Sequence, residues 1–167
     1  MDTRTIGKAM NHTLLHLVIG HLPVFGSFMG AVVMTYGLLA GSSSTKRSAY
    51  ILFILSAIGA VLAYLSGAGA KDTVKMLADT GRNTIGIHRD FAALALAAAA
   101  ALGILSAAGL IIRFKSRSPS HTLAGITLFI SLITLALAAW TGYLGLQIRH
   151  TETEAPASDI RNPAETP

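Results

Sequence analysis

The stretch His16-Leu-Val-Ile-Gly-His21-Leu-Pro23 places two imidazoles and a proline inside a long apolar segment. That segment covers residues 11–40, and a helix needs only about 20 residues to cross a bilayer. Ionisable side chains are costly within a membrane, so those that occur there are candidates for a functional site. The two histidines are therefore the first candidates in this chain.

The composition of the whole chain is typical of a membrane protein. Of its 167 residues, 52% are hydrophobic and only 13% are charged, and the mean hydropathy is +0.58. Barrel strands are excluded because the apolar segments are too long and do not alternate with a two-residue period, so helices remain. We predict an all-α fold, a polytopic membrane four-helix bundle with helices at residues 11–40, 49–70, 87–112 and 122–149.

The four predicted helices form one domain, residues 11–150, between two polar ends. A short polar lead covers residues 1–10, and the acidic, proline-containing tail at residues 151–167 is expected to be disordered. Pro23 cannot donate a backbone hydrogen bond, so the first helix is expected to kink there or to start afresh.

An even number of spans puts the N- and C-termini on the same side of the membrane, together with the connection between the second and third helices. The other two connections, residues 41–48 and 113–120, hold five Lys or Arg residues and no acid. Basic residues concentrate in short cytoplasmic loops, so we expect the termini to face outward from a bacterial inner membrane.

Five of the six histidines lie on this outer side: His12, His16, His21, His88 and His150. A four-helix bundle can bring such side chains together at one end and build a cofactor site from facing helices. Haem needs two ligands from different helices, and the pair His21 and His88 is favoured, with His16 and His150 as a second pair. The sixth histidine, His121, is interpreted as an exposed residue at a helix start on the other side.

Two arginines adjoin candidate ligands. Arg89 and Arg149 could pair with haem propionates, although extension of the side chain to the membrane interface is the simpler interpretation of both. The histidines have a comparable alternative, hydrogen bonding to headgroups or loop carbonyls without any cofactor.

The absence of cysteine excludes disulfides, covalently attached haem and iron–sulfur clusters. A non-haem copper or zinc site is an alternative to haem, because His12 and His16 are four residues apart and share a helix face. His88 and His150 would complete that site. A third alternative is a cofactor-free assembly subunit of a membrane complex.

The spacing His16-x4-His21-x-Pro23, the histidine that opens the third span, and Thr141-Gly142-x-x-Gly145 followed by His150 resemble the domain-of-unknown-function 2231 family. The resemblance covers residues 12–150 and implies a small bacterial four-helix membrane protein with histidine positions at 16, 21, 88 and 150. Some members are joined to c-type cytochrome modules, which implies a redox setting. The chain departs from the pattern at Leu17, where proline is frequent, and at Leu146, where glycine is frequent.

The sequence thus predicts a b-type cytochrome-like electron carrier, or a subunit of a redox complex rather than a stand-alone enzyme. One or two haem b groups would exchange electrons between a quinone or other membrane partner and an outer-side cytochrome or similar redox protein. Homo- or hetero-oligomers are compatible with this hypothesis. Nothing in the sequence indicates a nucleic-acid surface, and the high pI is explained by membrane topology.

Overall fold

A computed structural model describes residues 3–68, 79–115 and 121–159 of the chain, with side chains for residues 18–67, 86–112 and 121–147. The described residues form four helices, α1 (Thr3–Leu39), α2 (Ser43–Ala68), α4 (Asp79–Lys115) and α5 (His121–Asp159). The segments at residues 1–2, 69–78, 116–120 and 160–167 lie outside the description. The predicted all-α four-helix fold is confirmed.

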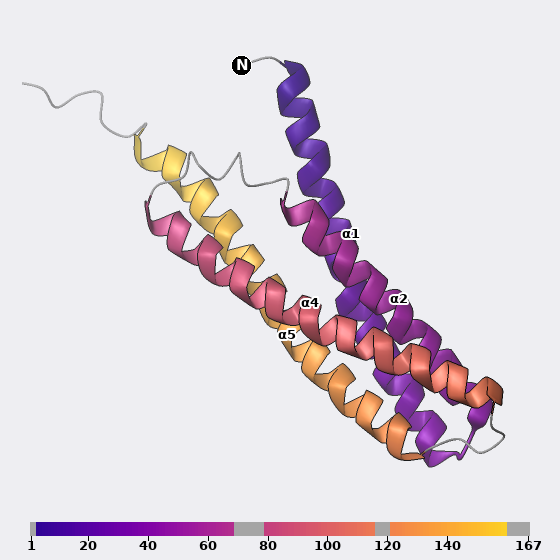
Figure 1. The fold of residues 1–167 in the computed structure, drawn as a ribbon. Coiled ribbons are helices and arrows are strands. Elements are labelled where there is room, and N and C mark those ends of the chain that lie inside the picture. The colour runs from indigo at the N-terminus through magenta and orange to yellow at the C-terminus, as the bar shows by residue number, and fades with distance from the viewer. Residues whose placement is uncertain (1–2, 69–78, 116–120, 160–167) are drawn as a thin grey trace, which may run out of the picture.

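The helices form two hairpins, α1 with α2 and α4 with α5, that pack on each other. In addition to its hairpin partner, α1 packs against α5, and α2 packs against α4, so α1 and α4 lie on a diagonal of the bundle. The two hairpins lie together at the end that holds the α1–α2 turn and diverge toward the end where α1 begins and α5 ends (Figure 1). We call these the turn end and the terminal end.

The helices extend beyond the predicted spans. α1 begins at Thr3 and α4 at Asp79, and α5 continues to Asp159 into the segment expected to be disordered. α2 begins at Ser43, ahead of the predicted residue 49, because Ser42 caps it: the backbone N–H of Thr45 donates to the Ser42 hydroxyl at 3.3 Å.

Pro23 does not interrupt α1. The helix is continuous from Thr3 to Leu39 with Pro23 inside it, so the expectation of a fresh start at the proline is corrected. The Pro23 carbonyl accepts a hydrogen bond of 2.9 Å from the Ser56 hydroxyl on α2. Neighbouring helices and Ser or Thr side chains commonly support proline within membrane helices in this way.

The distribution of polar and apolar side chains in the bundle is typical of a protein in lipid. Among the residues whose side chains are described, the buried polar ones are hydroxyls and one lysine: Ser27, Lys46, Ser56, Ser106, Thr127, Ser131 and Thr134. Large apolar side chains face outward on every helix, among them Phe25, Leu65, Ile104 and Phe129. Together with four candidate spans, Val18–Leu39, Ser43–Gly67, Gly86–Ile112 and His121–Gln147, this defines an integral membrane protein.

The core lies in the half of the bundle nearer the turn end. It is built from Met34, Ala49, Tyr50, Phe53, Leu102 and Ala124. Toward the terminal end, no residue in 61–67 of α2 or 86–98 of α4 is buried. The predicted histidine site therefore belongs to the less tightly packed end of the molecule.

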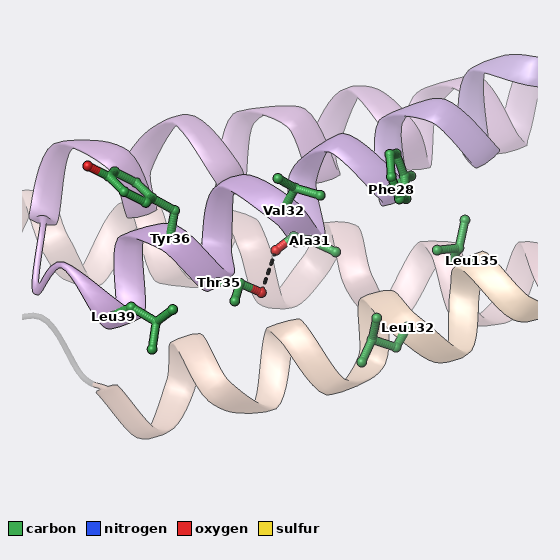
Figure 2. A pocket seen from close by; sticks show the side chains of 8 residues that line it. All are labelled: Phe28, Ala31, Val32, Thr35, Tyr36, Leu39, Leu132 and Leu135. Carbon is green, nitrogen blue, oxygen red and sulfur yellow. Dashed lines mark hydrogen bonds between the residues drawn. The ribbon is translucent and has the colours of Figure 1, made fainter.

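An apolar groove with a volume of about 430 Å³ lies between α1 and α5 (Figure 2). It is lined by Phe28, Ala31, Val32, Thr35, Tyr36, Leu39, Leu132 and Leu135. The Thr35 hydroxyl in this lining donates a hydrogen bond of 2.8 Å to the Ala31 carbonyl of the same helix. Since no lining side chain is charged, this groove suits hydrocarbon.

Candidate functional site at the terminal end

His88 is held by a hydrogen bond to the neighbouring helix of its hairpin. It is half-buried on α4, and its Nδ1 lies 3.0 Å from the carbonyl oxygen of Thr141 on α5. A carbonyl can only accept, so Nδ1 carries the hydrogen, and the lone pair of the neutral ring is on Nε2. Metal-ligating histidines are oriented by a bond of this kind from the nitrogen that does not bind the metal.

Glycine provides the space for the His88 ring on α5. A Cβ atom added at Gly145 would lie 3.5 Å from His88 Cε1, which is ordinary van der Waals contact. A branched side chain at that position would reach further and displace the ring. The residues Thr141 and Gly145, which belong to the motif recognised in the sequence, thus fix the orientation of His88.

His21 is placed differently. Its side chain is exposed, and its ring stacks on Phe25 of the same helix, with centroids 6.2 Å apart and an interplanar angle of 23°. The Phe25 contact of His21 and the Thr141 contact of His88 thus lie on different hairpins.

The two histidines also differ in depth. Leu22 packs on Gly59 of α2, and Ala57 of α2 packs on Gly103 of α4. Measured along these contacts at 1.5 Å per residue, His88 lies roughly 18 Å nearer the terminal end than His21 does. The two histidines of the favoured pair, His21 and His88, therefore lie at different depths in the bundle.

The remaining predicted ligands lie at the terminal end of the helices. His12 and His16 belong to α1, and Arg149 and His150 belong to α5, but their side chains lie outside the described residues. His121 is the first residue of α5, at the turn end, and it is exposed. This agrees with its interpretation as an exposed residue at a helix start.

Arg89 is directed away from the bundle. Its side chain is 67% exposed and its Nε lies 3.9 Å from Oδ1 of Asp90, which is itself exposed. Exposed ion pairs contribute little to stability, and this placement agrees with a side chain that extends to the membrane interface.

Aromatic rings mark that interface near His88. Trp140 contacts Phe91 of α4, with centroids 6.3 Å apart, and Tyr143 of α5, with centroids 5.6 Å apart. Trp and Tyr concentrate at the boundary between hydrocarbon and water. His88, one helix turn from these rings along the hairpin, therefore lies near the membrane surface.

Among residues with described side chains, no three His, Asp or Glu groups are arranged to hold a metal ion. The copper or zinc alternative depends on His12, His16 and His150 in addition to His88, and the first three lie outside that set.

The sequence interpretation missed the polar interior. Lys46 was placed in a loop, yet it is a buried residue in the first turns of α2. Thr127, Ser131 and Thr134 recur at a spacing of one helix turn and all face inward. This spacing in the sequence could have predicted a helix face lined by hydroxyl groups.

No known protein family, curated protein or solved structure matches the chain. The resemblance to the domain-of-unknown-function 2231 family therefore depends on the quoted residues alone. What the fold defines is an integral membrane four-helix bundle with hydroxyl groups in its interior and an oriented histidine near its terminal end.

Proposed function

We propose that the protein is a membrane-embedded b-type cytochrome-like electron carrier in which His88 is an axial ligand of haem. The observation that supports this most directly is the 3.0 Å bond from His88 Nδ1 to the Thr141 carbonyl. This bond fixes the tautomer that presents Nε2, the nitrogen with the lone pair, to a metal. An iron ligand that binds through Nε2 needs this tautomer.

The second ligand in this proposal comes from α1, because α1 and α4 occupy a diagonal and can face each other across the bundle. His16 lies five residues nearer the terminal end than His21, which is about 7.5 Å along the helix. Of the two haem-ligand candidates on α1, His16 is therefore nearer in depth to His88, at roughly 10 Å along the bundle, and we propose it as the partner. The pair His21 and His88 is the alternative, and mutagenesis distinguishes between the two pairs.

His88 and a histidine of α1 would hold the haem between two helices, and a haem held by two histidines would supply electron transfer in place of oxygen chemistry. Arg149 is the candidate for its propionates, since the exposed position of Arg89 suits the membrane interface. In this proposal electrons pass between a quinone or other membrane partner and a redox protein at the terminal end, which faces outward from a bacterial inner membrane.

The test is a reduced-minus-oxidised absorption spectrum of detergent-purified protein made with ample haem. We expect sharp α and β bands of a low-spin b-type centre, with haem stoichiometry from a pyridine haemochrome assay. His88→Ala should abolish one spectral component, and His121→Ala, which removes an exposed histidine at the turn end, should leave the spectrum unchanged. Of His16→Ala and His21→Ala, the variant that removes the same component as His88→Ala identifies the partner.

A featureless spectrum from wild-type protein would overturn the haem proposal. Elemental analysis would then separate the two other hypotheses, since bound copper or zinc indicates a metal-binding protein and its absence indicates an assembly subunit. Loss of the spectrum in the His121→Ala variant would show that the assay reports folding and would remove the support that His88→Ala provides.

A further inference from the structure

Lys46 is buried inside the bundle without a partner. Its side chain is 1% exposed, and its Nζ has no hydrogen-bond partner in the part of the chain that the structure describes. The adjacent Arg47 is exposed, so the burial of Lys46 is specific to its helix face. A buried ammonium group is strongly destabilising unless an anion or hydrogen-bond acceptor compensates it.

The stem of Lys46 is tightly fitted against α1. A Cβ atom added at Gly37 would lie 3.0 Å from both Cγ and the backbone nitrogen of Lys46. Side chains on a helix point toward its N-terminus, and α2 begins at Ser43. The ammonium group is therefore directed toward the turn end, close to the membrane surface.

No carboxylate of the chain can reach this position. Five of the eight acids belong to the terminal-end parts of α4 and α5: Asp79, Asp90, Glu152, Glu154 and Asp159. Asp2 directly precedes α1, and Glu165 follows the end of α5 by six residues, so neither can span the length of the bundle to Lys46.

The last acid, Asp72, follows the far end of α2. From Lys46 to Ala68 the helix is about 33 Å long, and four further residues span at most about 14 Å. An anion that compensates the Lys46 ammonium group would therefore come from outside the chain.

We propose that Lys46 binds a phosphate group at the turn end of the bundle. Lysine is a common point-charge ligand of phosphate, and basic pockets between membrane helices bind the headgroups of anionic lipids. Arg47 near the start of α2 and Arg113 and Lys115 at the end of α4 add positive charge at this end of the bundle, which attracts anions. Two sources carry this chemistry, the phosphodiester of an anionic phospholipid and free inorganic phosphate. This site is independent of the histidines.

The experiment measures thermal unfolding of the delipidated full chain in detergent. Phosphatidylglycerol or inorganic phosphate is added separately, with chloride at matched ionic strength as the reference. For wild type we expect a rise in Tm of roughly 2–4 °C. A rise with phosphatidylglycerol alone identifies a lipid headgroup, and a rise with inorganic phosphate identifies a free anion.

The variants separate binding from general charge effects. Lys46→Met and Lys46→Gln should fold and lose the rise in Tm, because each removes the charge and keeps an unbranched side chain. Arg47→Met, which removes an exposed neighbouring charge, should keep the rise. Ser106→Ala should also keep it, although Ser106 Oγ is likewise buried without a partner. An unchanged rise in both Lys46 variants, or no rise in wild type with either anion, would overturn the proposal.

Discussion

Among the individual residues, Ser27 and Ser56 form a short chain of hydrogen bonds that joins α1 to α2 beside Pro23. Ser56 donates its one hydroxyl hydrogen to the Pro23 carbonyl at 2.9 Å. The 2.8 Å bond between the two hydroxyls must then have Ser27 as its donor. Inside a membrane such bonds between helices contribute roughly 0.6–2 kcal/mol each.

We predict that Ser56→Ala destabilises the protein by about 1 kcal/mol, because it removes the acceptor for Ser27 and the donor for Pro23. Ser56→Val should be more harmful, since Gly26 packs so closely that a Cβ added there would lie 2.8 Å from Ser56 Cβ. Denaturant unfolding in mixed micelles measures both. The control is Ser48→Ala on the exposed side of α2, and equal stabilities of Ser48→Ala and Ser56→Ala would contradict the prediction.

The sequence identifies His88 as a candidate ligand but not its orientation. Its hydrogen-bond partner, Thr141, is 53 residues away along the chain, and which carbonyl faces the ring depends on the register between two helices. Lys46 was missed for a local reason. Ser42 caps α2, so the helix begins at Ser43. The apolar pattern from which the helix start was predicted begins only at residue 49 and does not include this polar part.

For the helices as elements, close packing of α1 on α2 depends on glycine. Gly26 lies against Ser56, and Gly30 lies against the ring of Phe53, so the small-residue spacing Gly26-x-x-x-Gly30 lets α2 approach closely. The same spacing at Gly37 and Gly41 has another meaning. Gly37 packs on Lys46, but Gly41 has a φ of +63° and forms the turn between the helices.

Two glycine-to-alanine substitutions should have opposite effects. At Gly30 the new Cβ would overlap the ring of Phe53, which is fully buried and cannot move aside, so we expect a loss of roughly 1–3 kcal/mol. At Gly125 nothing lies within 4 Å of the new Cβ, and we expect a gain of up to about 1 kcal/mol from helix propensity. Thermal or denaturant unfolding of both variants checks this. A gain at both positions would show that helix propensity outweighs packing at Gly30, and a loss at both would contradict the open space at Gly125.

For the whole molecule, the number of helices and the membrane class follow from segment length and apolarity, whereas the packing arrangement does not. In a soluble bundle an apolar stripe identifies the buried face of each helix. In lipid the outward face is apolar too, so Phe129 and Leu102 look alike in the sequence although one is exposed and the other fully buried. The sequence therefore could not predict the depth and register of the helices, or whether His21 and His88 form a pair.

The orientation of the molecule in the membrane gives the last prediction. Four spans place the turn end and the terminal end on opposite sides, and the acid-free basic connections favour a cytoplasmic turn end. Because the chain lacks cysteine, single substitutions can be labelled without background. Asp90→Cys, exposed at the terminal end, should react with a membrane-impermeant thiol reagent on intact cells. Ser44→Cys, exposed at the turn end, should react only after permeabilisation. The reverse pattern would place the Lys46 site outside, and labelling of both on intact cells would contradict four complete spans.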